Sequence, residues 1–298
     1  MEVVPSGNRL RSIQFSWNLR KVDWMQYDVL CAHGDDWFLW GRPRPRHLHT
    51  FHGSCAAEML HATRFVYRVK MACWAMFEYA TCLLADELIT VSSVTRRFIP
   101  WIKHVIPCGV NTEAFRPGDK KSDRPSILFV GTMLGRKRGA MLVEKFTNEI
   151  RKAVPDAELW CVCEESVEAP GVKWFGRVPL ETLTALYRNA WAFCLPSTYE
   201  GFGVPYIEAM SAGTPVIASP NDGAVEVTGN GQYGIVCDDD ALSTHLISVL
   251  TDERLRDDLR ARGLKRAQDF SWSRVCEMYE ELFTTTSKTS VEPAQVSA

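Results

Sequence analysis

The sequence has no Cys-x-x-Cys pair, no Asn-x-Ser/Thr sequon and no basic segment followed by an apolar leader after Met1. Its 10 cysteines are scattered, and Cys161 and Cys163 are the only two that lie close together in the sequence. Secreted domains held by disulfides usually show paired spacings and a leader. We therefore expect a protein of the reducing cytoplasm.

Long apolar runs are also missing. The most apolar stretch, residues 65–85, is interrupted by Arg68, Lys70 and Glu78, which leaves it short of the roughly 20 apolar residues that span a bilayer. It predicts a helix that is largely buried. The alternative is a helix on a membrane surface, with apolar side chains in lipid and basic ones on phosphates (Trp74, Met76, Phe77; Arg64, Arg68, Lys70).

Charge of one sign is lacking as well, because 34 Lys and Arg face 36 Asp and Glu. Residues 1–118 hold 14 basic and 10 acidic side chains, which leaves 20 and 26 for the rest. Neither part has the clustered basic surface of a nucleic-acid-binding protein, so we expect no nucleic-acid partner. The first part also holds six of the 10 Trp, which suits an anionic or amphiphilic partner, although a mixed solvated surface gives the same count.

Short apolar runs alternate with longer helix-compatible stretches, which is typical of α/β proteins with parallel sheets. A length of 298 residues favours two domains. We expect strands at 27–32, 47–51, 87–91 and 104–106, and then at 126–130, 158–163, 172–175, 191–195, 215–218 and 235–237. We expect helices at 139–152, 180–189, 204–212, 241–250, 253–268 and 271–283.

Turn-forming residues at 116–125 predict an exposed linker. We place a first domain at 1–117, a second at 118–270, a terminal helix at 271–283 and a disordered tail at 284–298. Residues 1–22 show no periodic pattern, and the first domain has four expected strands against six in the second. The first domain therefore lacks elements that a parallel sheet needs to cover both of its faces.

The densest chemical signal lies at residues 196–219, where an expected strand leads into a glycine-containing loop and a helix. Pro205 in the first turn favours a helix start near residue 204. The backbone N–H groups of Gly201, Phe202 and Gly203 would then attract anions and hydroxyl oxygens. Glu200 and Glu208 could face one crevice and bind vicinal hydroxyls, which suits sugars and ribose.

A second loop, residues 131–139, joins an expected strand to an expected helix and carries three consecutive cations, Arg136, Lys137 and Arg138. A glycine-containing turn with this charge suits phosphate. The alternative is a solvated basic turn.

The two glutamates resemble the E-x7-E signature of the retaining GT-B glycosyltransferases of family 4, and the resemblance extends over residues 27–283. It implies two Rossmann-like domains, the first one incomplete. It matches Lys137 to the lysine that grips the donor diphosphate. The family usually has an arginine where Thr132 stands here, so either Arg136 or Arg138 supplies that charge or the diphosphate is stabilised less.

The resemblance implies a metal-independent hexosyl or glycosyl transferase that moves a sugar from a nucleoside-diphosphate donor with retention of configuration and without a cofactor. Lys137 would stabilise the leaving group, Glu200 would contact the donor sugar, Glu208 would bind ribose, and His52 would close the site from the first domain. The acceptor is a saccharide, lipid or small molecule, reached at the inner membrane surface in the lipid case. The alternative is a truncated, non-catalytic protein that binds nucleotide sugars, because the family's first strand and glycine loop have no counterpart here.

Two metal patterns compete with this interpretation. His47, His49 and His52 could form a zinc site, but no further ligands accompany them in the sequence, so we expect no metal. Asp238, Asp239 and Asp240 satisfy a DxD pattern, for which we expect a solvated turn.

Overall fold

The structure is a computed structural model that describes residues 11–34, 36, 39–62 and 64–287. The chain divides into two compact units, Met1–Val105 and Ile106–Ala298. Among the described residues, no helix combines the length and the apolar character needed to cross a bilayer. Both units are α/β, with every strand pair parallel, as the alternating sequence pattern predicts.

The first unit contains a four-stranded sheet in the order β1-β2-β3-β4. The four predicted strands are confirmed: β1 Val29–Ala32, β3 Glu87–Thr90 and β4 His104–Val105 are shorter than predicted, and β2 Arg46–Phe51 is one residue longer. The helical elements are α1 Arg11–Leu19, η1 Trp24–Gln26, α2 Cys55–His61, α3 Phe65–Leu84 and η3 Ser93–Arg97. Helix α1 lies within residues 1–22, where the sequence showed no periodic pattern.

Helix α3 occupies the predicted range, but the expectation that it is largely buried is wrong. Its buried residues are Met71, Ala75, Thr81 and Leu84, four of the 20 residues of the helix. Residues 64–70 at its N-terminal end are all exposed. Apolar composition alone therefore overestimated how much of this helix enters the core.

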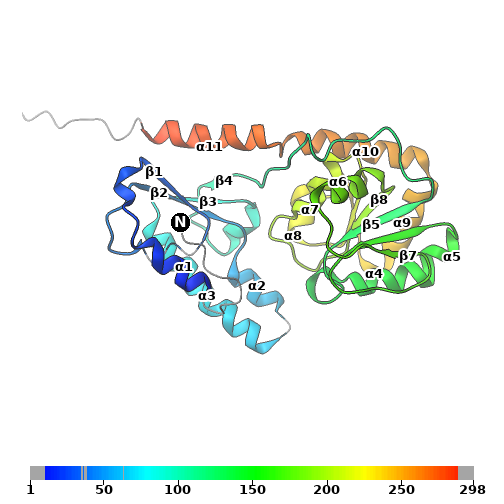
Figure 1. Cartoon of the computed structure of the whole chain (residues 1–298), viewed down its shortest axis with the longest axis horizontal. Helices are drawn as coiled ribbons and strands as arrows, with labels where there is room; N and C mark the ends of the chain where they lie inside the picture. Colours follow the sequence, from blue (N-terminus) through cyan, green and yellow to red (C-terminus); the bar gives the residue numbers. More distant parts are fainter. Residues whose placement is uncertain (1–10, 35, 37–38, 63, 288–298) are drawn as a thin grey trace, which may run out of the picture. The chain divides into compact units, whose positions relative to one another are not determined.

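The second unit contains a six-stranded sheet in the order β10-β9-β8-β5-β6-β7. Its predicted strands are all confirmed: β5 Ser126–Val130, β6 Glu158–Val162, β7 Val172–Trp174, β8 Ala192–Leu195, β9 Val216–Ala218 and β10 Ile235–Val236. Strand β8 is buried throughout, as expected for a strand covered on both faces. Figure 1 shows α6 and α7 on one side of this sheet and α4 on the other.

The helical elements of the second unit follow the predicted pattern. They are η4 Gly135–Lys137, α4 Gly139–Lys145, η5 Phe146–Ile150, α5 Arg151–Ala153, α6 Leu180–Asn189, α7 Val204–Ser211, α8 Asp222–Val227, α9 Asp239–Thr251, α10 Glu253–Gln268 and α11 Trp272–Ser287. The predicted helix at 139–152 is real, but η5 interrupts it as a π-helical turn. Helix α11 continues through Ser287, so residues 284–287 do not belong to a disordered tail; residues 288–298 lie outside the described range.

The polar stretch at 116–125 is exposed at six of its ten positions, as predicted, but Lys121 anchors it to the second unit. Lys121 Nζ donates hydrogen bonds to the carbonyls of Arg188 and Gly213 and to Thr214 Oγ1, at 2.8–3.0 Å. Burial, together with the nearby positive charges of Arg260 and Arg256, lowers the pKa of Lys121 to about 7. Upstream, Val110 bridges to Ser271, so the second unit begins before the predicted linker.

Candidate functional site

The strand order of the second unit identifies where a ligand can bind. From β5 the chain proceeds to β6 and β7 on one side of the sheet, and then to β8, β9 and β10 on the other. The switch point therefore lies between β5 and β8. In open parallel sheets the crevice at the carboxyl ends of the strands flanking this point is the usual ligand site. The loops that leave β5 and β8 there carry Lys137 and Glu200.

The two loops meet at the carboxylate of Glu200. Lys137 Nζ lies 2.8 Å from Glu200 Oε1, and Arg136 Nη1 lies 3.1 Å from Oε2. The Ser197 hydroxyl donates to Oε1 at 2.7 Å. Glu200 is 5% exposed, so this carboxylate is fixed by two cations and a hydroxyl from its own loop and the neighbouring one.

Arg136 is the cation of this cluster that reaches solvent. Its side chain is 48% exposed, and its Nη1 also donates to the Tyr199 carbonyl at 2.8 Å. The Thr132 hydroxyl donates to the Leu134 carbonyl within the same loop. Of the two arginines considered for the charge at this loop, Arg136 is therefore the one that contacts Glu200 and reaches solvent.

Arg138 has a different environment, although it is adjacent in sequence. Its guanidinium donates to the Pro196 carbonyl at 2.6 Å, to both oxygens of Asp239 at 2.6 and 2.9 Å, and to Ser219 Oγ at 2.9 Å. Its backbone is left-handed, with φ 55°, a conformation unfavourable for a non-glycine residue. Arg138 thus ties the loop after β5 to the ends of β8 and β9 and to the start of α9.

Asp239 therefore does not lie in a solvated turn, as the sequence suggested. Its neighbour Asp238 caps α9 by accepting a hydrogen bond from the Ala241 backbone N–H. The pKa of Asp239 is lowered, mainly by its hydrogen bonds and charge interaction with Arg138. Asp239 is thus paired with Arg138 at the start of α9, with its side chain 45% exposed.

Helix α7 begins where predicted, and its start is sterically constrained. Gly203, the N-cap residue, has φ 97°, and a Cβ there would lie 2.4 Å from the Tyr206 ring. The Phe202 ring packs edge-to-face on Phe270 at 5.5 Å. A Cβ on Gly223 would lie 2.6 Å from the Phe202 carbonyl oxygen. The absence of a side chain at Gly223 therefore allows α8 to pack closely against residues 200–203, the loop that contains Gly201.

Glu208 lies one turn into α7, partly buried and close to Tyr187 and Lys137. Burial raises the pKa of Glu208 to about 7, while the Tyr187 hydroxyl and the Lys137 ammonium oppose that shift. The structure therefore brings Glu200, Glu208 and Lys137 into one neighbourhood, as the sequence predicts. Because burial outweighs these two interactions, the Glu208 carboxyl group titrates near neutral pH.

His52 belongs to the first unit, where it lines a pocket of about 290 Å³. Its Nε2 lies 2.9 Å from His33 Nδ1. Burial, followed by the positive charges of His33 and His49, lowers the pKa of His52, and burial likewise lowers that of His33. Other lining residues combine aromatic rings and carboxylates: Trp74, Phe77, Glu58 and Glu78. The sequence did not indicate His33 as a site residue, because its partner His52 lies 19 positions away on another loop.

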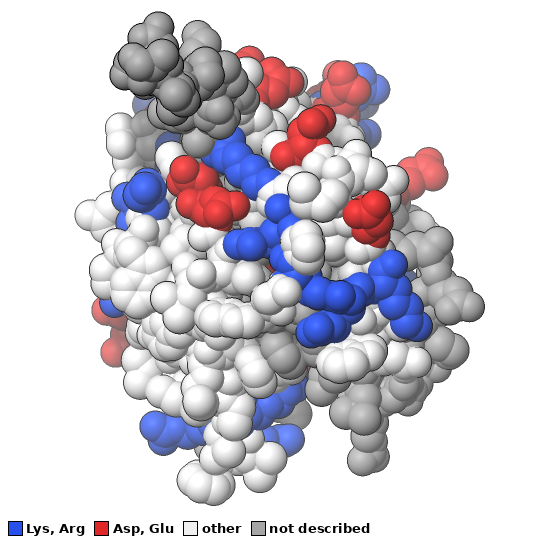
Figure 2. All heavy atoms as spheres, turned by 90° about the vertical axis from the view of Figure 1, so that its left-hand side faces the viewer, with Lys and Arg blue, Asp and Glu red and all other residues white. Residues whose placement is uncertain are grey.

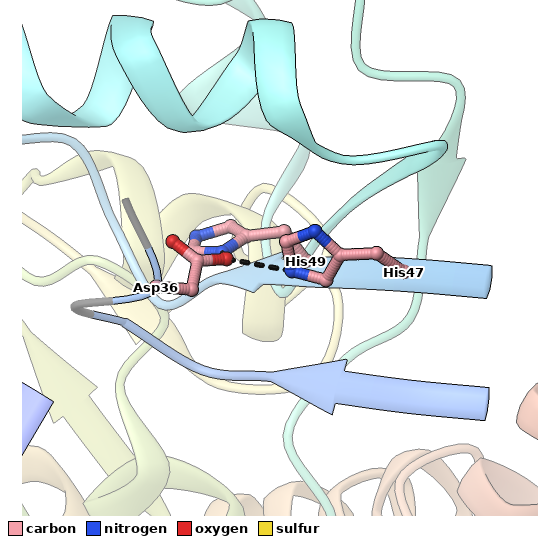
Figure 3. Close-up of side chains that lie close together, drawn as sticks. All are labelled: Asp36, His47 and His49. Carbon is pink, nitrogen blue, oxygen red and sulfur yellow. Dashed lines mark hydrogen bonds and ion pairs between the residues drawn. The ribbon is translucent and has the colours of Figure 1, made fainter. Parts of the chain in front are cut away.

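The predicted histidine cluster is arranged differently from the zinc site considered above. Asp36, His47 and His49 each offer a ligand atom, all three within 4.8 Å of one another and all three residues buried (Figure 3). Asp36 Oδ2 lies 2.6 Å from His49 Nδ1 and 2.8 Å from His47 Nε2. At these distances the Asp36 carboxylate is in direct contact with both imidazole rings. His52 is paired with His33 instead.

Asp36 serves as the centre of this buried network. Burial alone would raise its pKa, but the interactions with His47 and His49 hold the pKa of Asp36 well below its usual range. The Thr81 hydroxyl donates to the second oxygen at 2.9 Å. Arg44 Nε donates to His47 Nδ1 at 3.4 Å, which favours a proton on His47 Nε2, facing Asp36. A metal-bound His47 would need that nitrogen unprotonated.

Curated relatives match this chain over part of its length. It is 37% identical over 161 residues to the O-antigen chain mannosyltransferase B of Escherichia coli, covering 49% of this chain and 42% of that protein. It is 30% identical over 213 residues to the MMP alpha-(1->4)-mannosyltransferase of Mycolicibacterium hassiacum, covering 63% of this chain and 51% of that protein. The chain thus spans about half the length of the curated relatives it matches.

Solved structures match the fold over nearly the whole chain. Sucrose-phosphate synthase from Thermosynechococcus elongatus superimposes with a TM-score of 0.76 at 23% identity, covering 96% of this chain and 81% of that one. WaaG, a glycosyltransferase involved in lipopolysaccharide biosynthesis, gives a TM-score of 0.72 at 17% identity, covering 95% and 86%. At these identities the likeness establishes the GT-B fold, as predicted.

Two family patterns match successive parts of the sequence. The pattern described as Glycosyltransferase Family 4 matches residues 2–114, and the pattern described as Glycosyl transferases group 1 matches residues 110–266. The second match includes both glutamates and the cationic loop after β5. The chain belongs to the glycosyl transferases group 1 family.

Proposed function

We propose that this protein transfers a sugar from a nucleoside-diphosphate donor to an acceptor hydroxyl, with retention of configuration and without a resident metal or cofactor. The observation that carries the proposal is the contact of Lys137 with Glu200 at the switch point of the second sheet, 2.8 Å long. A cation beside an acid at this edge provides adjacent groups for a diphosphate and for sugar hydroxyls. Mannose is the first sugar to test, because two of the relatives are named mannosyltransferases.

Different residues of the second unit would bind the diphosphate, the sugar and the ribose of the donor. Departure of a nucleoside diphosphate places negative charge on the leaving group, which preorganised cations stabilise. Lys137 and the solvent-reaching Arg136 would supply that stabilisation, with the N–H groups of residues 201–203 at the start of α7. Glu200 would accept hydrogen bonds from the donor sugar, and Glu208 from ribose hydroxyls. Arg138 would act indirectly, by positioning Lys137.

The pocket of the first unit would bind the acceptor molecule. Aromatic faces such as Trp74 and Phe77 pack against the apolar faces of sugar rings, while Glu58 and Glu78 can accept hydroxyl hydrogen bonds. A neutral His52 would contact the transferred sugar. A saccharide or glycolipid headgroup satisfies this lining best, and a lipid acceptor would place the protein at the inner surface of the cytoplasmic membrane.

Transfer can be tested with GDP-mannose and a panel of UDP-, GDP- and ADP-sugars, using a soluble saccharide acceptor and wild-type full chain. We expect turnover with one donor class and an anomer in the product that matches the donor, read by NMR. Glu200→Ala should abolish it. An inverted anomer would contradict retention. Loss of activity after treatment with a chelator, or a stoichiometric metal in the purified protein, would contradict metal independence.

The alternative is a non-catalytic protein that binds nucleotide sugars. Calorimetry with the same donor panel distinguishes the two: micromolar binding without turnover over any acceptor favours the alternative. Absence of both binding and turnover would contradict both assignments for this chain.

A further inference from the structure

Exposed apolar side chains are unevenly distributed between the two units. Among the described residues, fourteen of the eighteen large apolar side chains that are exposed belong to the first unit, and four belong to the second. Scattered single apolar residues on a surface need no explanation, whereas a contiguous group often marks an interaction site. A docking surface is therefore more readily formed by the first unit than by the second.

Two of the most exposed of these residues, Phe65 and Val66, lie where α3 begins, shortly after α2 ends. We call residues 64–70 the α3 tip. Within it, Phe65 and Val66 are 79% and 80% exposed, and Val69 is about half exposed. Leu60 lies in the last turn of α2, shortly before the α3 tip in the sequence, and is 61% exposed. No buried residue of α3 precedes Met71, so the fold does not use these apolar side chains in its core.

The charges of the α3 tip are all positive. Arg64, Arg68 and Lys70 alternate with the apolar residues, and the sequence has no Asp or Glu between Glu58 and Glu78. Figure 2 shows one side of the first unit, where Lys and Arg side chains lie among uncharged ones and no acidic side chain is seen at the lower end. In Figure 1 the junction of α2 and α3 lies at the bottom of the first unit.

We propose that the α3 tip docks on a lipid bilayer that contains anionic headgroups. Phe65, Val66 and Val69 would enter the boundary between headgroups and acyl chains, while the three cations pair with lipid phosphates. A second copy of this chain fits poorly as the occupant, because a symmetric contact would place cations against cations. The inference deepens the membrane location included in the proposed function by naming the surface that makes the contact.

Vesicle flotation of the full chain tests this surface without requiring activity. We expect binding to phosphatidylcholine vesicles that contain about 30% phosphatidylglycerol, weak binding to pure phosphatidylcholine, and a loss of binding as salt is raised. The double variant Arg64→Glu/Arg68→Glu should reduce partitioning at least tenfold, since each basic residue near an anionic surface contributes substantially. Phe65→Ser/Val66→Ser should reduce it as well, at every salt concentration.

Matched controls lie in the second unit. Leu180→Ser removes a side chain that is 59% exposed, and Arg254→Glu reverses an exposed cation; neither should change flotation. The tip variants should keep the wild-type thermal midpoint and wild-type transfer to a soluble acceptor. Equal binding to neutral and anionic vesicles, no binding at all, or unchanged binding by both tip variants would overturn the proposal. So would a wild-type dimer that the tip variants convert to monomers. Failure of transfer with intact flotation would count only against the proposed function.

Discussion

Lys137 and Glu200 contact each other at 2.8 Å although they are brought in by different loops, one after β5 and the other after β8. Each partner shields the charge of the other. A donor diphosphate would therefore have to compete with Glu200 for the same ammonium. The other contacts of Glu200, with Ser197 and Arg136, would keep the carboxylate in place if Lys137 turned to the phosphate.

Replacing Lys137 by Met should lower kcat/KM for the donor at least about a hundredfold, because a preorganised cation facing a departing diphosphate contributes on this scale. Lys137→Arg should restore part of the loss, since it keeps the charge. The measurement is a steady-state rate with varied donor at saturating acceptor.

The matched control is Lys145→Met, which removes a cation in the last turn of α4 that pairs with Glu149 of η5. It should leave kcat/KM unchanged. If Lys137→Met and Lys145→Met behave alike, Lys137 has no special role in leaving-group stabilisation.

The anchoring of Arg138 predicts an unusual order of stabilities. Arg138→Ala removes four hydrogen bonds and should cost about 2 kcal/mol of unfolding free energy. Arg138→Gly loses the same bonds but relieves the left-handed backbone of φ 55°, so it should be more stable than the alanine variant by about 1 kcal/mol. Denaturant unfolding of both variants measures this difference.

Asp239→Ala tests the other end of the same ion pair. Combined with Arg138→Ala, it should cost clearly less than the sum of the two single changes, because both remove one interaction. Additive costs would show that Arg138 and Asp239 do not depend on each other. Both single variants should also weaken donor binding, since they loosen the loop that carries Lys137.

The sequence predicted the strands of both sheets and the meeting of Lys137 with Glu200, because both follow from local patterns and from parallel topology. Apolar runs define the strands, Pro205 and Gly203 define the start of α7, and the ends of adjacent parallel strands share one edge. Thr132 and Arg136 were correctly grouped with Lys137 in one loop.

What the sequence did not reveal depends on partners far apart in the chain. Arg138 and Asp239 are 101 positions apart, so no local pattern reveals their ion pair. Helix α2 has seven residues with a Ser54 cap, too few for a periodic signal.

The titration of Glu208 predicts how stability changes with pH. Its pKa in the folded protein is about 7, above the 4.5 of an unperturbed glutamate. The protonated form therefore favours folding, and this contribution is complete below about pH 4.5 and is lost as pH rises to 7. Its size is on the order of 3 kcal/mol, because each pKa unit corresponds to about 1.4 kcal/mol.

Glu208→Gln should remove this term, so that its unfolding free energy falls less between pH 5 and pH 8 than that of wild type. Denaturant unfolding at both pH values gives the comparison. Glu226→Gln, in α8, is the matched control and should retain the wild-type slope. Identical slopes for all three proteins would mean that Glu208 titrates in its ordinary range.

His33 and His52 should titrate as a pair. The pKa of His52 is lowered first by burial and then by the positive charge of His33, whose Nδ1 lies 2.9 Å away. His33→Asn removes that charge, so the pKa of His52 should rise toward its ordinary value of about 6.5. Ring-carbon NMR shifts of labelled histidines measure the change, with the exposed His61→Asn as control.

The same variant affects transfer if neutral His52 accepts a hydrogen bond from a sugar hydroxyl. A larger fraction of His52 would be charged at pH 6 in His33→Asn, so the ratio of the transfer rate at pH 6 to that at pH 8 should fall. A His52 pKa that stays constant or falls would show that the two rings are not electrostatically coupled.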